Sequence, residues 1–227
     1  MKIFTPLIAM LLMMGAAYAD VKGTWQVSNG HPVTVYYQDD DHVRMDVGND
    51  TYLLIIREKA YTVMNQGGQK MVLDMESMGG AMKAFGGMAM QQAEAKANAY
   101  DPDSVAYGKT GKQETIAGYK GDLYEVSVKG PNGLEKYEFV ASTHKDVVQL
   151  QKAFQIIGER MAKTLMSKDT LAGFNRAAEM AESQNIGGML RYGNEMVLKS
   201  LERKDLPADI FLLPKDAVKM MLPSFGQ

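Results

Sequence analysis

The chain has 227 residues, a formal net charge of −2, 23% charged residues and 46% hydrophobic residues. These values are typical of a globular protein and exclude global disorder and a multi-span membrane protein. There is no excess of basic residues to attract a nucleic acid, so we expect no nucleic-acid partner. The chain has 19 methionines and no cysteine, so its core has to form without disulfides.

Residues 1–19 have the pattern of a secretory leader. Lys2 supplies the basic start, residues 7–14 form a short apolar stretch, and Ala17-Tyr18-Ala19 supplies small residues for the cleaving peptidase. The apolar stretch is much shorter than the roughly 20 residues that span a bilayer, which disfavours a membrane anchor. We therefore expect cleavage near Ala19, an exported, periplasmic mature chain of residues 20–227, and no transmembrane segment.

Residues 21–74 alternate between apolar and polar side chains with a period of two. In one clear run, Val43, Met45 and Val47 are separated by polar residues. Turn sequences divide the apolar runs: Asn29-Gly30, Asp39-Asp40-Asp41, Gly48-Asn49-Asp50 and Gln66-Gly67-Gly68. This pattern predicts a meander of half-buried antiparallel strands.

The alternation stops at about residue 75, resumes over 105–142, and then gives way to apolar residues at intervals of three and four. The patterns predict helices at 75–98, 146–166 and 169–183, and two further strands at 189–193 and 195–204. Because strands flank the helices, we predict one α+β domain over residues 20–227. Its expected form is a single curved antiparallel sheet, or half-barrel, of about nine to eleven strands with helices packed on its concave face.

Several segments resemble a bacterial exported family of unknown function. They are Gly23-Thr24-Trp25, Val43-Arg44-Met45-Asp46, Lys59 to Asn65, Gly111 to Gly121 and Phe211-Leu212-Leu213-Pro214. The family often has a cysteine where this chain has Lys120-Gly121, and an aromatic residue near the end where this chain has Ala217. The family looks like part of the lipoprotein-carrier (LolA/LolB-like) superfamily. This resemblance implies a half-barrel wrapped around helices, whose concave face binds acyl chains in the carriers.

The sequence contains none of the common catalytic signatures. Gly108-Lys109-Thr110 lacks the glycine that a phosphate-binding loop requires five residues earlier, where Asp103 stands. The acidic run Asp39-Asp40-Asp41 lacks the alternate spacing and the final glutamate of a calcium loop. Three histidines stand apart at expected turn or strand-edge positions: His31, His42 and His144. We therefore predict no enzymatic activity and no cofactor.

A cluster of methionines is the strongest functional signal in the sequence. Its members are Met64, Met71, Met75, Met78, Met82, Met88 and Met90. Met75, Met78, Met82 and Phe85 recur at helical spacing, but Gly79-Gly80 and Gly86-Gly87 weaken the helix. Three interpretations stay open. The cluster fills the core, forms an adaptable lid or apolar ligand surface, or binds Cu(I) through the thioethers of Met75, Met78 and Met82.

We predict a non-enzymatic exported protein that binds an apolar ligand, such as a lipid or a lipoprotein acyl chain. The candidate ligand-binding residues are Met71, Met75, Met78, Met82, Phe85, Met88, Phe154 and Ile157. The helix 146–166 that carries the last two has a polar face of mixed charge, which favours packing against the sheet over adsorption to lipid. Two alternatives stay open: the Cu(I)-binding protein, and a structural or protein-interaction domain with a filled core.

Overall fold

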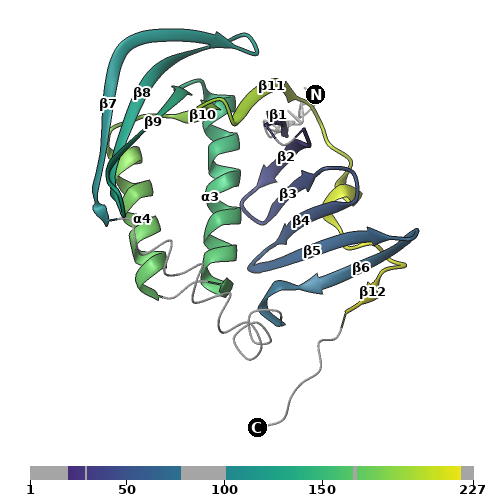
Figure 1. Ribbon diagram of the computed structural model, residues 1–227. Helices are drawn as coiled ribbons and strands as arrows, with labels where there is room; N and C mark the ends of the chain where they lie inside the picture. Colours follow the sequence, from purple (N-terminus) through teal and green to yellow (C-terminus); the bar gives the residue numbers. More distant parts are fainter. Residues whose placement is uncertain (1–19, 29, 78–100, 166–167, 221–227) are drawn as a thin grey trace, which may run out of the picture.

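The computed structural model describes residues 20–28, 30–77, 101–165 and 168–220 (Figure 1). The strands are β1 (Val21–Val27), β2 (Pro32–Asp39), β3 (His42–Val47), β4 (Thr51–Ile56), β5 (Lys59–Gln66), β6 (Gln69–Asp74), β7 (Asp101–Ile116), β8 (Tyr119–Gly130), β9 (Gly133–Ser142), β10 (Gly188–Tyr192), β11 (Met196–Arg203) and β12 (Val218–Lys219). The helices are α3 (Lys145–Leu165), α4 (Lys168–Ser183) and the 3₁₀ helix η1 (Ala208–Phe211). The strands join in one sheet in the order β12-β6-β5-β4-β3-β2-β1-β11-β10-β9-β8-β7.

The first half of the sheet is the meander that the period-two pattern predicts. From β1 to β6, each strand pairs antiparallel with the next along the chain. The turn between β5 and β6 places Gly67 at φ 61° and Gly68 at φ 81°. Two consecutive positive φ angles suit the right-handed twist of a hairpin, and glycine adopts them without a steric penalty. Alternation and turn chemistry therefore agree along this half of the chain.

The predicted fold class, a single curved antiparallel half-barrel with helices packed on its concave face, is wrong. The described residues form a mixed sheet of twelve strands, because β12 pairs in parallel with β6 and brings Val218 opposite Met71. The sheet is open, with β12 at one end and β7 at the other. Among the described residues only α3 and α4 are long helices, so this part of the chain is one large sheet with few helices. The predicted helix 75–98 is described only at residues 75–77, which are helical, and the rest of it lies outside the described residues.

The fold prediction was wrong because the alternation of apolar and polar residues does not determine how strands pair. A period of two identifies a half-buried strand, but it specifies neither the direction nor the partner of that strand. The strand β12 has two residues, too few to show any period. Its parallel pairing depends on the path of the chain after η1, which brings the backbone N–H of Met220 within 2.9 Å of the carbonyl oxygen of Val72.

The helix α3 lies between the two halves of the sheet, with β1–β6 on one side and β7–β9 on the other (Figure 1). It contacts β1, β2, β3, β5, β10 and β11, whereas α4 contacts β7 and α3. The buried stripe of α3 includes Val147, Leu150, Ala153 and Ile157. These residues share one hydrophobic cluster with Trp25 and Val35 of the sheet. Burying each large apolar side chain contributes about 1.5–3 kcal/mol, so α3 is firmly docked on β1 and β2.

An ion pair fixes the first turn of α3. Nε of Arg203, in β11, donates a 3.0 Å hydrogen bond to Oδ1 of Asp146, and the same guanidinium also donates to Oε1 of Gln149. Asp146 is 8% exposed, so its carboxylate needs a charged partner. A negative charge in the first turn of a helix is also favoured by the helix dipole. The start of α3 is therefore tied to the strand next to β1.

The segment after β11 packs on the sheet face opposite to α3. Phe211 of η1 is 1% exposed, and η1 contacts β3 and β4. Arg44 of β3, whose neighbour Val43 belongs to the core under α3, donates a 3.2 Å hydrogen bond to the carbonyl oxygen of Ile210. The Arg44 guanidinium also lies 3.9 Å from the ring centroid of Tyr52, an attractive cation–π geometry. Both faces of the sheet are therefore covered at β3, by α3 on one side and by η1 on the other.

No helix in the described part of the chain combines the length and the apolar character that a membrane crossing requires.

Candidate functional site

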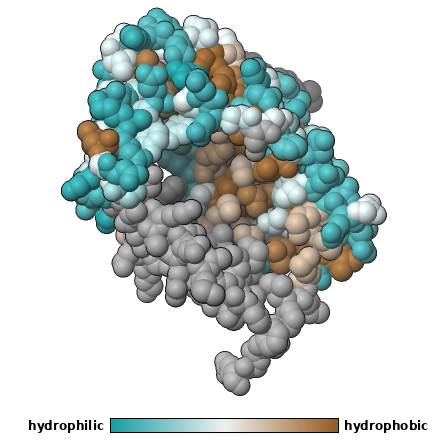
Figure 2. All heavy atoms as spheres, viewed as in Figure 1, coloured by the Kyte–Doolittle hydropathy of each residue, from teal (hydrophilic) through white to brown (hydrophobic). Residues whose placement is uncertain are grey.

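A cavity of about 800 Å³ lies between α3, α4 and strands from both halves of the sheet. Figure 2 shows a hollow in this face of the molecule, with hydrophobic residues inside it and hydrophilic residues around much of its rim. The volume is within the roughly 300–1,000 Å³ of typical small-molecule sites. Most of the described lining residues are aliphatic, aromatic or methionine. The cavity, which is open to the surface, can therefore hold an apolar molecule of substantial size.

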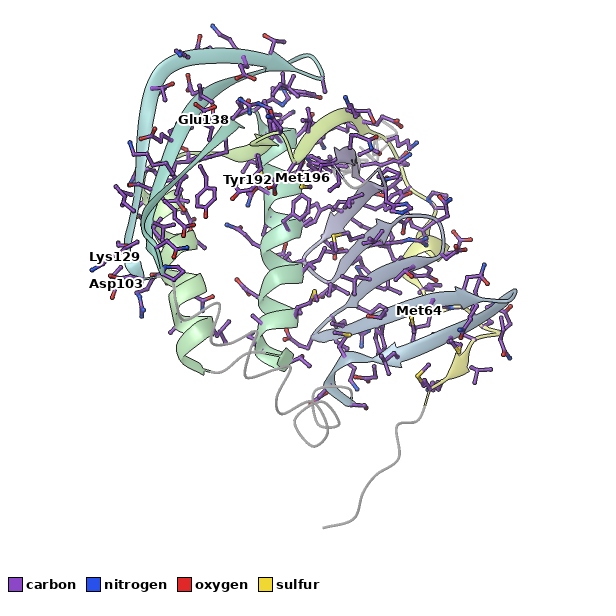
Figure 3. All side chains as sticks on the ribbon, viewed as in Figure 1. Met64, Asp103, Lys129, Glu138, Tyr192 and Met196 are labelled. Atoms are coloured by element: carbon purple, nitrogen blue, oxygen red, sulfur yellow. The ribbon has the colours of Figure 1, made fainter. Side chains whose placement is uncertain are left out.

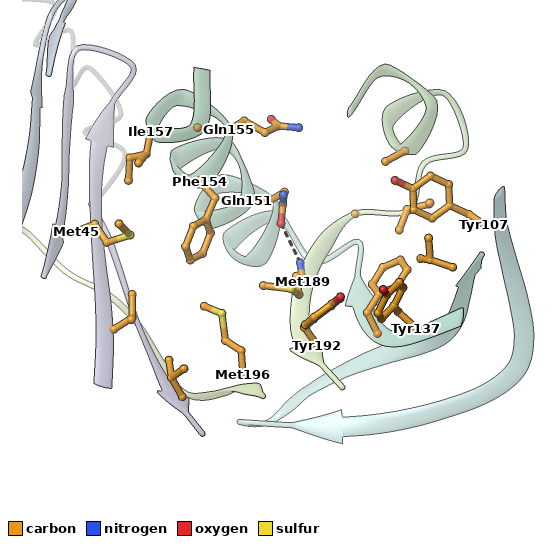
Figure 4. A pocket seen from close by; sticks show the side chains of 18 residues that line it. Met45, Tyr107, Tyr137, Gln151, Phe154, Gln155, Ile157, Met189, Tyr192 and Met196 are labelled. Carbon is orange, nitrogen blue, oxygen red and sulfur yellow. Dashed lines mark hydrogen bonds between the residues drawn. The ribbon is translucent and has the colours of Figure 1, made fainter. Parts of the chain in front are cut away.

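The cavity has two ends that differ in chemistry (Figure 4). We define the apolar end as Val27, Val33, Met45, Phe154, Ile157 and Met196. We define the tyrosine end as Tyr107, Val126, Tyr137, Phe139, Met189 and Tyr192, together with Gln151 and Gln155 of α3. The first end offers only apolar groups, whereas the second combines aromatic surface with hydroxyl and amide groups.

Helical spacing explains how α3 serves both ends. Gln151 and Gln155 are four residues apart and lie on one side of the helix, while Phe154 and Ile157 are three apart and lie on another. The ring of Phe154 meets the buried ring of Trp25 edge-on, with centroids 5.0 Å apart. Because this contact anchors Phe154 on the core, the wall of the apolar end is pre-formed rather than free to collapse.

Strand register assembles the tyrosine end. Val126 of β8 stands directly opposite Tyr107 on one side and Tyr137 on the other, and Tyr192 of β10 stands opposite Phe139. Residues directly opposite one another on neighbouring strands share a face of the sheet. Tyr137 and Tyr192 stack with centroids 6.2 Å apart, and Tyr107 meets Phe139 edge-on at 6.1 Å. Figure 3 shows Tyr192 and Met196 beside one end of α3.

The described lining of the cavity is uncharged. Its described lining residues include no aspartate, glutamate, lysine, arginine or histidine. Burial raises the pKa of the Tyr107 hydroxyl, because a surrounding of low polarity disfavours the phenolate. Among the described residues, no three histidine, aspartate or glutamate side chains lie together in a way that could hold a metal ion. The arrangement suits binding of a neutral molecule.

The two glutamines differ in how they are held. Oε1 of Gln151 accepts a 3.3 Å hydrogen bond from the backbone N–H of Met189, which orients the Gln151 amide (Figure 4). Gln155 is half-buried, and its side chain makes no hydrogen bond to any described residue. A second hollow of about 220 Å³ adjoins Gln155 and is also lined by Glu159, Glu179 and Glu182. Gln155 therefore stands where the cavity meets an acidic surface.

The structure divides the predicted ligand-binding residues. Phe154 and Ile157 both line the cavity. Met71 lies in β6, opposite Met64 and Val218, and Met75 is 2% exposed in the core, where its sulfur accepts a 3.1 Å hydrogen bond from the Thr62 hydroxyl. Neither of these two methionines is among the lining residues. The other predicted residues, Met78, Met82, Phe85 and Met88, lie outside the described residues, and so do two of the three proposed Cu(I) ligands.

The acidic turn between β2 and β3 has partners within the protein. Oδ1 of Asp39 lies 2.8 Å from Nδ1 of His42. Asp40 accepts hydrogen bonds from Lys152 of α3 and from the Tyr37 hydroxyl, both at 2.7 Å. The Lys152 ammonium and then the Tyr37 hydroxyl hold the pKa of the Asp40 carboxyl below its ordinary value. These side chains connect the turn to α3.

The tyrosine end and three methionines of the cavity were not predicted from the sequence. The unpredicted methionines are Met45, Met189 and Met196. One signal was available, because Tyr137 and Phe139 alternate with charged residues in β9, which marks one face of that strand as apolar. The alternation does not show that α3 and α4 approach that face without filling the space between them. The methionine-rich stretch at 64–90 instead favoured a ligand site within that stretch.

No protein-family model and no curated protein matches the chain. A solved structure described as "Structure of PNGF-II in C2 space group" is similar to it with a TM-score of 0.36 and 10% sequence identity. The match covers 89% of this chain and 31% of the other chain, so this chain spans about a third of that protein's length. A TM-score this low does not establish a shared fold.

Proposed function

We propose that the protein is an exported, non-enzymatic binding protein that holds an apolar ligand in the cavity beside α3. The ligand class is a lipid or the acyl chain of a lipoprotein. One observation supports the proposal above all: a cavity of about 800 Å³ whose described lining is predominantly apolar and carries no charged side chain. The sequence resemblance to lipoprotein carriers agrees with this ligand class. The half-barrel that the resemblance implied is not found, so the proposal rests on the cavity.

The energetics favour an acyl chain over water in this space. Burying each methylene of a chain contributes about 0.8 kcal/mol, so a chain of modest length binds well even after the cost of ordering it. The methionines Met45, Met189 and Met196 line the cavity, and unbranched thioether side chains adapt to flexible ligands. The described residues leave this hollow open to the surface and unfilled. This observation supports ligand binding over the alternative of a structural domain with a filled core.

A titration with N-phenyl-1-naphthylamine tests the proposal, because this uncharged probe fluoresces strongly only in apolar surroundings. We expect saturable binding to the purified exported protein with one strong site, and displacement of the probe by a C16 monoacylglycerol. Native mass spectrometry of the titrated sample checks the stoichiometry of the complex. A fluorescence increase that never saturates, together with a mass spectrum that contains only free protein, would contradict the proposal.

A further inference from the structure

The cavity has a polarity gradient that an entirely apolar ligand would not use. At one end Met45, Phe154 and Ile157 offer only apolar surface, while Gln151 and Gln155 add amide groups at the other (Figure 4). Burying a polar group without a hydrogen-bond partner costs free energy. Gln155 is half-buried as a residue, its amide remains accessible to solvent, and its side chain makes no hydrogen bond to any described residue. A ligand that covers this amide excludes water from it, so a hydrogen-bonding group on the ligand at that end would replace the hydrogen bonds to water.

The same end is unfavourable for an anionic group. No lysine, arginine or histidine is among the described residues that line the cavity, so a carboxylate or phosphate there would lack the cationic partner that offsets its desolvation. Glu159, Glu179 and Glu182 line the hollow that adjoins Gln155, and their negative charges would repel an anion. An amide offers two N–H donors and an acceptor oxygen, which can pair with a hydroxyl or an ester but bring no positive charge to balance an anion.

We propose that the ligand is an uncharged lipid with a hydroxyl or ester group, of which a monoacylglycerol is the model compound. This inference rests on the proposed function, because it names the ligand class of the same cavity. The acyl chain lies against the apolar end, and the hydroxyl or ester group bonds to Gln155 at the tyrosine end. Ionised fatty acids should bind more weakly, because their carboxylate has no cationic partner among the described lining residues.

Displacement of bound N-phenyl-1-naphthylamine by a matched pair of ligands tests the inference. Palmitate and methyl palmitate have the same chain, and the methyl ester removes the charge. At neutral pH we expect methyl palmitate and monopalmitin to displace the probe at concentrations at least about tenfold lower than palmitate, because burying an unpaired carboxylate costs several times RT. If palmitate displaces the probe as well as methyl palmitate does, the inference is wrong but the proposed function stands. If the probe does not bind at all, the proposed function itself is contradicted, and the inference with it.

The variant Gln155→Leu tests the polar contact separately. The ratio of the affinity for monopalmitin to the affinity for hexadecane should fall about fivefold, which is the effect of one lost hydrogen bond. The matched control is Gln184→Leu, which makes the same change at an exposed position after α4 and should leave the preference as it was. An unchanged preference in Gln155→Leu would overturn the assignment of this residue.

Discussion

Replacing Gly188 by alanine should lower the free energy of unfolding by about 3 kcal/mol, the upper part of the range for overpacked sites. Gly188 begins β10 and is buried. A Cβ atom added there would lie 2.2 Å from the carbonyl oxygen of Val147 and 2.6 Å from its carbonyl carbon. These are backbone atoms in the first turns of α3, so relief requires the helix itself to move. The helix is docked through its buried stripe and cannot move without loss of packing.

The measurement is thermal or urea denaturation of the variant beside the wild-type protein. A loss of 3 kcal/mol corresponds to a fall in Tm of about 6–12 °C for a chain of this size. The matched control is Gly108→Ala in β7, where the added Cβ would meet its nearest neighbour, the Glu125 carbonyl oxygen, at an ordinary 3.6 Å. The control should change stability by less than about 0.5 kcal/mol. Equal stability of the two variants would show that the first turns of α3 do not pack closely against Gly188.

Replacing Gly158 by leucine should weaken binding of N-phenyl-1-naphthylamine at least about tenfold, while the protein stays folded. Gly158 lies in α3 and lines the cavity, so a leucine side chain at this position takes up space that the ligand needs. Leucine also has a higher helix propensity than glycine by somewhat less than about 1 kcal/mol, which favours the folded state. Loss of binding without loss of stability is therefore the expected result, measured by probe titration and thermal denaturation of the same sample.

The matched control is Lys163→Leu, which adds the same apolar side chain at an exposed position of α3. It should bind the probe with the wild-type affinity. A second variant, Val126→Phe, narrows the tyrosine end from β8 and should weaken probe binding independently of any effect on α3. Wild-type binding by both Gly158→Leu and Val126→Phe would place the ligand elsewhere and remove the cavity as the binding site.

Local structure was largely predictable because local rules determine it. Alternation located β1 to β6 and β8 to β9, and the spacing of apolar residues located α3 within one residue of its ends. The order and direction of strand pairing were harder to predict from the sequence, because they depend on contacts between segments far apart in the chain. The parallel strand β12 and the packing of Phe211 against the sheet face opposite α3 both come from the last third of the chain.

The candidate site was predictable only in part, for a related reason. Phe154 and Ile157 were identified because they belong to the apolar stripe of a strongly amphipathic helix. A cavity, however, is the space that helices and strands leave between them, and the residue pattern of one segment does not determine its distance from another. Tyr107, Tyr137 and Tyr192 come from three strands, and only the register of those strands reveals that they face one volume.

The methyl groups of methionine provide the most direct test of where the ligand binds. Met45, Met189 and Met196 line the cavity. Met64 and Met71 stand opposite one another on β5 and β6 and are not among the lining residues, and Figure 3 shows Met64 far from Met196. NMR spectra of protein with ¹³C-methyl methionine, assigned by single Met→Leu substitutions, should be recorded during a titration with monopalmitin. We predict saturable shifts for Met45, Met189 and Met196, and unchanged signals for Met64 and Met71. Shifts at Met64 and Met71 with unchanged signals from the three cavity methionines would contradict the assignment of the cavity as the ligand site.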